Sequence, residues 1–275
     1  MQIFCLTHAG IRMSDEQFQG GKMRVIRVRD YDELSQRSAD LIASLIILKP
    51  DCVLGLATGD TPLGTYRGLI RLYSEGRIDF SQVSSVNLDE YRGLKTDDPH
   101  SYRYFMDQNL FHDINIDPAH TFVPDGCESD PAAACSKYDA IIDRFPLIDL
   151  QLLGLGGDGH IGFNEPSDCF IRRTHCVTLK EETIRANSRF FQDKAEVPHQ
   201  AYTMGIADIM KASRILMIVS GSSKAAILRQ VLEGPVTPAV PASVLHLHRN
   251  CTVIADEDAL QCCDRLCKDS QFILP

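Results

Sequence analysis

The sequence has 275 residues, enough for one large domain with a sizeable core that needs no cross-links. Hydrophobic residues make up 44% and charged residues 24%, which excludes a disordered chain. With 28 Lys and Arg against 37 Asp and Glu, the formal net charge of -9 argues against a nucleic-acid or anionic-membrane surface as the main function. An anionic small substrate would therefore need a local cationic site.

The ten cysteines form no recognisable disulfide or zinc pattern, because no C-x-x-C pair occurs. Reduced thiols in a cytoplasmic protein are the expected state. The longest apolar stretch, 41–48, is too short to span a bilayer, and the N-terminus lacks the basic and apolar regions of a signal peptide. We therefore predict a cytoplasmic location and no membrane partner.

The first predicted elements lead to a candidate anion site. Residues 1–22 are a possible N-terminal extension, 23–28 are strand-like, 32–48 have the apolar face of a helix, and 52–57 form a continuous apolar run typical of a central parallel strand. Thr58-Gly-Asp-Thr-Pro62 follows, in which Thr61 is a good N-cap and Pro62 suits the first helical position. Amides at such a helix start, around Thr58, Gly59 and Thr61, favour phosphate. The alternative is an ordinary strand-to-helix turn, and the carboxylate of Asp60 would repel phosphate unless it points away.

The next strand, 83–88, ends in two adjacent acids, Asp89 and Glu90. Acidic side chains at the carboxyl end of a strand lie where α/β proteins collect their active sites. The alternative is that this pair caps a helix or forms a solvated turn. Helices are expected at 101–111 and 131–145.

The central stretch of the chain is 152–166, where a buried strand at 148–155 runs into a glycine-rich turn. The turn and its exit carry Asp158, His160, Asn164 and Glu165, so two carboxylates flank one imidazole. Such a setting can fix the tautomer of the imidazole and shift its pKa. The alternative is that the two acids cap turns and the histidine is an ordinary loop residue.

The last third of the chain supplies further cations. A strand is expected at 176–179 and a helix at 181–191, in which Arg185 and Arg189 could form a solvated face. Residues 214–220 form a core strand, after which Ser222 can cap a helix whose first turn holds Lys224. A cation is electrostatically misplaced in a first helical turn unless an anion joins it, so Lys224 is a candidate phosphate ligand. A last strand at 251–255 and a helix at 257–268 follow.

The alternation of strands and helices predicts an α/β fold: a single-domain, open, mostly parallel sheet with helices on both faces, Rossmann-like, over 23–275. No internal repeat or Gly/Ser linker divides the chain. All candidate residues except Arg189 follow the carboxyl ends of strands, so they can converge on one crevice. Carboxylates, an imidazole and a cationic clamp suit proton transfer between adjacent carbons of a phosphorylated sugar.

The run Gly154 to Pro166 fits the pattern G-x-G-x-D-G-H-I-x-F-N-E-P and resembles the glucosamine-6-phosphate deaminase (isomerising) family of the glucosamine/galactosamine-6-phosphate isomerase superfamily. The resemblance extends from Met23 to about Ala255. It implies conversion of glucosamine 6-phosphate and water to fructose 6-phosphate and ammonia, in amino-sugar (N-acetylglucosamine) catabolism, with no metal or organic cofactor.

The resemblance also implies roles for residues of this chain. His160 would open the pyranose ring, oriented and tuned by Asp158 and Glu165. Asp89 would move the proton from C2 to C1, giving an enolamine that hydrolyses with loss of ammonia. The residues implied to hold the phosphate are Thr58, Gly59, Thr61, Arg189 and Lys224.

Some bacterial members of the family that this chain resembles are hexamers activated by N-acetylglucosamine 6-phosphate, bound through a basic pair and a serine just after the N-E-P segment. The corresponding positions here are Asp168, His175 and Val177. A phosphate site lined by Asp and Val would be poor, so we predict a homo-oligomer, smaller than a hexamer, without this activation.

Two other functions compete with this one. A 6-phosphogluconolactonase-like hydrolase shares a G-D-G-H core, but that family usually continues with Thr-Ala-Ser-Leu-Phe-Pro where this chain has Ile-Gly-Phe-Asn-Glu-Pro. A non-enzymatic sugar-phosphate sensor would keep the site without catalysis, which the intact acids and His160 argue against. The sequence leaves open the choice between glucosamine and galactosamine 6-phosphate.

Overall fold

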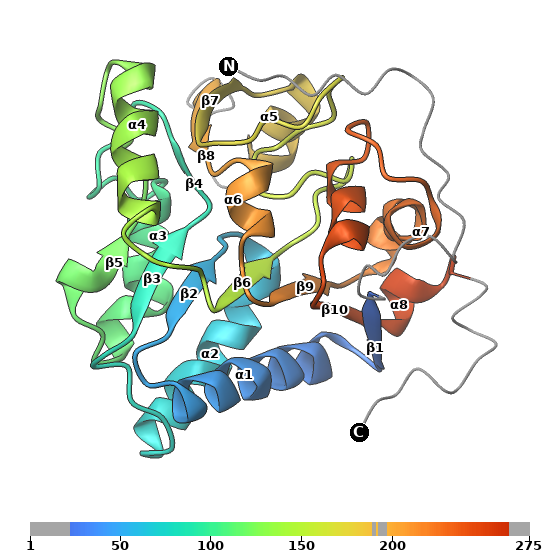
Figure 1. Cartoon of the computed structure of the whole chain (residues 1–275). Helices are drawn as coiled ribbons and strands as arrows, with labels where there is room; N and C mark the ends of the chain where they lie inside the picture. Colours follow the sequence, from blue (N-terminus) through green and yellow to red (C-terminus); the bar gives the residue numbers. More distant parts are fainter. Residues whose placement is uncertain (1–22, 189–190, 192–196, 264–275) are drawn as a thin grey trace.

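The computed structural model describes residues 23–188, 191 and 197–263. A seven-stranded sheet lies at the centre of the fold (Figure 1). Every pair of neighbouring strands is parallel. In spatial order the strands are β1 (Arg24–Val28), β10 (Cys251–Asp256), β9 (Ile215–Val219), β6 (Leu150–Leu153), β2 (Val53–Leu56), β3 (Ser84–Asn87) and β5 (Thr121–Phe122). The predicted parallel sheet is confirmed, and the two-residue β5 is an addition at its edge.

Helices cover both faces of this sheet, as predicted (Figure 1). One face packs on α1 (Tyr31–Leu48), α2 (Asp60–Ser74) and α3 (Tyr102–Asn109). The other packs on α4 (Pro131–Ile142), α6 (Ile206–Met210), α7 (Ala225–Glu233) and α8 (Glu257–Leu260). Because β2 and β9 are buried at every position, their sequences are continuous apolar runs rather than alternating ones.

A second, antiparallel sheet begins just beyond the carboxyl end of β3 and was not predicted as such. It consists of β4 (Asp89–Tyr91), β8 (Gln200–Thr203) and β7 (His175–Thr178), in that order. Only β7 matches an expected strand. The chain leaves the main sheet at Leu88 and pairs with a segment more distant in sequence, so Asp89 lies opposite Thr203. Such pairing depends on tertiary contacts that periodicity within a short segment does not reveal.

Several helix starts differ from expectation. α2 begins at Asp60 with Gly59 as its N-cap residue, so Thr61 lies in the first turn and is not the cap. After β9 a short 3-10 helix, η5 (Ser222–Lys224), precedes α7, and the residue before it is Gly221 rather than a capping Ser222. Both glycines have positive φ, +100° and +93°, a conformation that L side chains rarely adopt. The turn geometry, not a side-chain cap, therefore starts these helices.

Two predicted helices are shorter than expected among the described residues: the helix predicted at 181–191 ends at Asn187, and the one predicted at 257–268 ends at Leu260. The short helix α6 and the 3-10 helices were not predicted. α5 spans Glu181–Asn187, and the 3-10 helices η1, η2 and η6 span Phe111–Asp113, Pro118–His120 and Pro241–Leu247. The predicted extension 1–22, Arg189 and the predicted helix beyond 263 lie outside the described residues. Among the described helices, none is long and apolar enough to cross a membrane.

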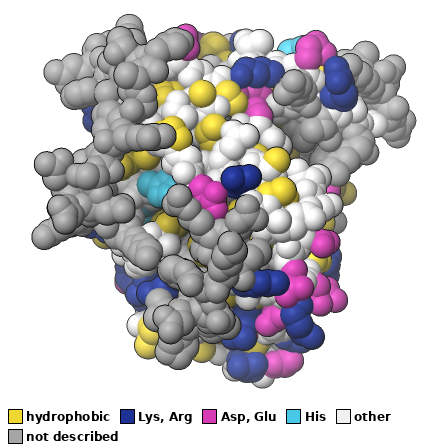
Figure 2. Space-filling model, turned by 90° about the vertical axis from the view of Figure 1, so that its right-hand side faces the viewer, with side chains coloured by type: hydrophobic (Ala, Val, Ile, Leu, Met, Phe, Trp, Pro, Cys, Tyr) yellow, Lys and Arg dark blue, Asp and Glu magenta, His cyan; other side chains and the backbone are white. Residues whose placement is uncertain are grey.

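Charged side chains of both signs lie together on the lower part of the surface in Figure 2, the level at which α1 lies in Figure 1. On α1 and just before it, Arg29 and Arg37 both pair with Glu33. The described part of this face is therefore mixed in sign rather than uniformly basic.

A charge cluster around Arg173 fastens the small sheet to two helices. The guanidinium contacts Asp139 in α4 at 3.1 Å and Asp143, the residue that caps the C-terminus of α4, at 2.7 Å. It also contacts Asp208 of α6 at 2.7 Å. The Asp208 side chain is 0% exposed, and its other cation, Lys211, is exposed and lies farther away, at 3.3 Å. Removing Arg173 therefore leaves a buried carboxylate that Lys211 compensates poorly.

Arg173→Met is therefore expected to lower the free energy of unfolding by about 3 kcal/mol, measured by urea denaturation. The matched control is Arg229→Met, which removes an exposed pair with Glu233 on α7 and should cost less than about 0.5 kcal/mol. Equal, small effects in both variants would contradict the structural role of Arg173.

Candidate active site

The candidate residues gather at the carboxyl ends of the parallel strands, around the point where the strand order reverses. β2 pairs with β3 on one side, and the chain returns to add β6 on its other side. Ligands of open α/β sheets bind in the crevice outside such a switch point. The loop after β2, with Thr58 and Gly59, and the loop after β6, with Asp158 and His160, flank it directly.

Asp158 and His160 form a hydrogen-bonded pair in the loop after β6. Asp158 Oδ1 lies 2.6 Å from His160 Nδ1 and also accepts the His160 amide at 3.2 Å. Burial raises the pKa of Asp158, but the hydrogen bond and charge of His160 outweigh burial and lower it below its ordinary value. Because an ionised carboxylate only accepts, Nδ1 carries the hydrogen, which leaves Nε2 of the imidazole for a substrate.

Two glycines of this loop, residues 154–166, make room for the side chains of His160 and Asp89. We call these residues the catalytic loop, after the role predicted for them. A Cβ on Gly156 would lie 2.3 Å from Nδ1 and Cε1 of His160, so the ring packs directly over the Gly156 backbone. Gly162 has a φ of +58°, and a Cβ there would lie 2.9 Å from Thr203 Oγ1 and 3.3 Å from Asp89 Oδ2. The glycines are thus required by close approach as well as by turn geometry.

Asp89 is buried beside the same loop, with 6% of its surface exposed. Its Oδ2 faces Gly162, and its cross-strand partner Thr203 accepts the Phe163 amide at 3.0 Å. Burial, and the neighbouring charge of Glu90, raise the pKa of the Asp89 carboxyl to about 8. A carboxylate of this pKa is an unusually strong base for its type and suits proton transfer near neutral pH.

Glu165 makes its hydrogen bonds to the start of α5. Its carboxylate accepts the amide of Lys180 at 3.1 Å and the hydroxyl of Thr183. Asn164 holds the loop from the other side, because its amide donates to the carbonyls of Ile161 and Met204, each at 2.9 Å. The structure thus pairs His160 with Asp158, and it directs Glu165 to α5; an orienting role of Glu165 on the imidazole stays a prediction.

The candidate phosphate ligands lie on both sides of the catalytic loop. Thr58, Gly59 and Thr61 surround the start of α2. Lys224 ends η5 after β9, and β9 and β2 are the two neighbours of β6 in the sheet. Asp60 is exposed at the helix start, and Arg189 is not among the described residues. Within the described part of the chain, no group of three or more His, Cys, Asp and Glu could hold a metal ion.

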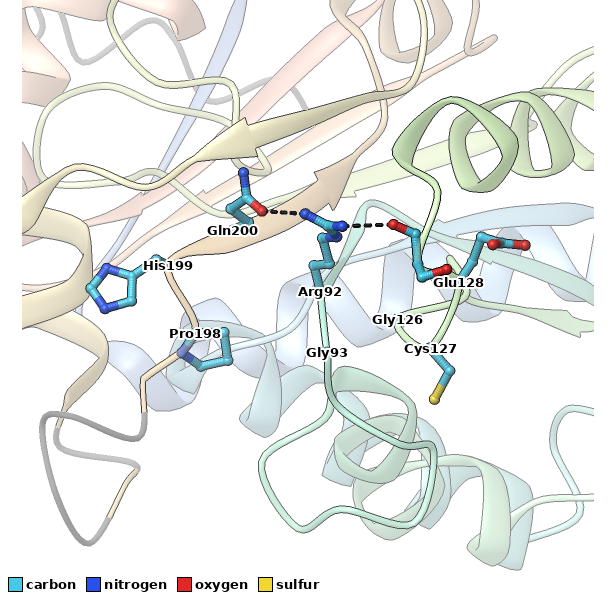
Figure 3. A pocket seen from close by; sticks show the side chains of 9 residues that line it. Arg92, Gly93, Gly126, Cys127, Glu128, Pro198, His199 and Gln200 are labelled. Atoms are coloured by element: carbon cyan, nitrogen blue, oxygen red, sulfur yellow. Dashed lines mark hydrogen bonds between the residues drawn. The ribbon is translucent and has the colours of Figure 1, made fainter.

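A separate cavity of about 400 Å³ lies beyond the other end of β4 (Figure 3). Arg92 lines it and donates to the side-chain carbonyl of Gln200 and to the Ser129 carbonyl. These hydrogen bonds hold the 126–129 loop against β8. None of the predicted site residues lines this cavity.

Comparison with known proteins gives a consistent result. Residues 29–254 match the family described as glucosamine-6-phosphate isomerases/6-phosphogluconolactonase. A glucosamine-6-phosphate deaminase of Lachnoclostridium phytofermentans is 55% identical over 84% of this chain and 98% of the relative, and one of Clostridium tetani is 54% identical over 86% and 98%. The chain belongs to the glucosamine-6-phosphate deaminase family.

Solved structures agree with this membership of the deaminase family. One described as a monomeric glucosamine-6-phosphate deaminase has a TM-score of 0.86 and 48% identity, covering 87% of this chain and all of that one. A 6-phosphogluconolactonase from Trypanosoma brucei has a TM-score of 0.69 at 19% identity, covering 88% and 99%, which shows a shared fold alone.

The structure separates the roles of Asp89 and Glu90 and adds two site residues, Thr203 and Tyr102, that the sequence did not single out. Glu90 accepts amides at the start of α3, so the helix-cap alternative describes Glu90 while Asp89 faces the catalytic loop. From β8, Thr203 accepts the Phe163 amide, and from α3 the ring of Tyr102 stacks on the ring of Phe163. Their only sequence signal was alternation on a strand and an aromatic residue near a helix start, which is too general to identify a site.

Proposed function

We propose that this chain is a glucosamine-6-phosphate deaminase, converting glucosamine 6-phosphate and water to fructose 6-phosphate and ammonia in amino-sugar catabolism. The observation that carries the proposal is 55% identity to a glucosamine-6-phosphate deaminase over 98% of that relative's length. The buried Asp89 faces Gly162, in the loop that carries the Asp158–His160 pair, and a carboxylate and an imidazole at one loop are what this reaction needs.

In the proposed mechanism, His160 Nε2 transfers the proton that opens the pyranose ring, while Asp158 holds Nδ1–H and fixes the tautomer. Asp89 then removes the proton from C2 of the open-chain amino sugar, giving an enolamine. Return of the proton to C1 gives an imine, which water hydrolyses to the ketone and ammonia. Glu165 orients the catalytic loop, because its hydrogen bonds fasten that loop to the start of α5.

The phosphate is proposed to bind between the start of α2 and Lys224. Amides near Thr58, Gly59 and Thr61 provide donors at a helix N-terminus, and Lys224, together with Arg189, provides positive charge. The start of α2 and the turn that carries Lys224 flank the catalytic loop. Binding the phosphate between them would therefore place C1 and C2 of the substrate at the catalytic loop.

The test is ammonia release from glucosamine 6-phosphate, with fructose 6-phosphate measured in the same reaction. Equal amounts of both products are expected. Galactosamine 6-phosphate, which differs only at the C4 hydroxyl, is measured in parallel because the sequence does not decide between them. Substrate binding without turnover of either sugar would overturn the proposal in favour of a sensor, and hydrolysis of 6-phosphogluconolactone alone would favour a lactonase.

Rates as a function of glucosamine 6-phosphate are expected to be hyperbolic and unchanged by N-acetylglucosamine 6-phosphate. His175 and Val177 line a cavity of about 210 Å³ behind the Asn164–Glu165 segment, and Asp168 is exposed beside it. Burial lowers the pKa of His175, which opposes the positive charge that a phosphate would need. Sigmoidal kinetics abolished by a saturating concentration of this effector would contradict the prediction.

We also propose a cytoplasmic homo-oligomer with 23–275 as its catalytic domain. The eight cysteines among the described residues are free, in keeping with a reducing compartment. The solved relative at 48% identity is described as monomeric, so light scattering on the purified chain is the direct test of self-association.

A further inference from the structure

Glu90 is almost completely buried next to Asp89 and is fully engaged with α3. It is 2% exposed. Its Oε1 accepts the amides of Tyr91 at 2.7 Å and Tyr102 at 2.9 Å, and its Oε2 accepts the amide of Arg103 at 2.9 Å. Two of these amides belong to the first turn of α3, where the helix dipole also favours a negative charge. Glu90 therefore ties β4 to α3.

Adjacent residues of a strand point to opposite faces, so this attachment determines where Asp89 points. With Glu90 held by α3 on one side, Asp89 faces Gly162 and lies opposite Thr203 on the other. A shift of Glu90 away from α3 would move the Asp89 carboxylate relative to the catalytic loop.

The charge of Glu90 also acts directly on Asp89. Among the described residues, the other titratable groups that interact with Asp89 are three phenols: Tyr66 of α2, Tyr102 of α3 and Tyr138 of α4. Burial raises the pKa of each of these three phenols, which keeps them uncharged at neutral pH. Glu90 itself faces Asp98 across the start of α3.

We propose that Glu90 is the positioning residue of the proton-transfer base: it anchors Asp89 through α3, and its negative charge makes Asp89 a stronger base. The effect on catalysis rests on the proposed function. The direction follows from electrostatics, because a nearby negative charge disfavours a second one and so favours protonated Asp89. Burial raises the pKa of Glu90 to about 7, although its three amide hydrogen bonds oppose this rise. Asp89 accepts no such amides from the described residues, so Glu90 is the first of the two carboxyls to ionise.

The test is the titration of Asp89 in ligand-free wild type and Glu90→Gln, followed by its carboxyl ¹³C resonance and assigned by the loss of that resonance in Asp89→Asn. We expect the midpoint to fall by about one pH unit in Glu90→Gln. The acidic limb of kcat/KM should move to lower pH by the same amount, and kcat at high pH should fall about threefold. Because the titration needs no turnover, it tests Glu90 even if glucosamine 6-phosphate is not the substrate.

The control is Ser101→Ala, which removes the N-cap hydroxyl that accepts the Tyr104 amide of the same helix without changing any charge. It should leave the Asp89 midpoint within about 0.3 unit of wild type, which is the precision of such a titration. An equal shift in Ser101→Ala and Glu90→Gln, or no shift in either, would overturn the proposal. If Glu90→Gln does not fold, Glu90→Asp decides: it keeps the charge, so a midpoint lowered by about one unit would refute the charge effect and an unchanged one would support it.

Discussion

Asp89→Asn is expected to lower kcat about 10³-fold with glucosamine 6-phosphate while leaving KM within about threefold of wild type. The amide has nearly the shape of the carboxyl but cannot accept the proton from C2. Asp89 faces the catalytic loop rather than the proposed phosphate loops, so substrate binding should persist. The measurement is steady-state ammonia release, with substrate binding followed separately by calorimetry.

The same substitution is expected to raise the midpoint of thermal unfolding at pH 8. Burial raises the pKa of Asp89 to about 8, whereas in the unfolded chain it is near 4. Between these values the folded protein binds the extra proton, so its stability falls as the pH rises toward 8. Replacing the carboxyl by an uncharged amide removes this loss of stability. Lost activity together with a lower midpoint at pH 8 would indicate general damage rather than loss of a base.

Gly156→Ala is expected to lower kcat about 10²-fold without unfolding the protein, because a displacement near 1 Å can cost this much. The new methyl group would lie 2.3 Å from the His160 ring, so the imidazole must move and its hydrogen bond to Asp158 must break or distort. Gly156 does not have a positive φ, so alanine introduces no backbone strain of that kind. The readouts are kcat and the thermal midpoint.

The matched control is Gly157→Ala at the next position. A Cβ there meets nothing within 4 Å, and φ is again not positive. We expect kcat within about twofold of wild type, as for an exposed substitution away from any packed feature. Loss of activity in both variants to the same degree would show that the loop tolerates no side chain, independently of His160.

The main sheet could be predicted because its strands are buried on both faces. The runs at 52–57 and 215–219 are continuous in apolar residues, and such runs have few other interpretations between turn signals. β5 and β8 are short or carry polar residues, and what makes them strands is a partner elsewhere in the chain. For the same reason the departure of the chain from the main sheet at Leu88 was not visible in the sequence.

The sequence predicted which loops converge at the site, but it did not predict which side chains contact each other there. A carboxyl, an imidazole and glycines following β3 and β6 must lie at one edge of a parallel sheet, and they do. Spacing in the sequence cannot tell that Asp158 contacts His160 while Glu165 reaches to Thr183, because the path of the loop decides which carboxylate faces which group. The burial of Asp89, which sets its base strength, likewise depends on helices remote in the sequence.

The pairing of β1 with β10 has a consequence for biosynthesis. Among the described strands, the first of the chain finds its only sheet neighbour in the last one, with Arg24 opposite Thr252. While the polypeptide emerges from the ribosome, β1 has no partner, and β9 likewise exposes the edge that β10 will occupy. The sheet cannot be completed until synthesis is nearly finished, so nascent chains that end before residue 251 should remain dependent on chaperones and sensitive to protease.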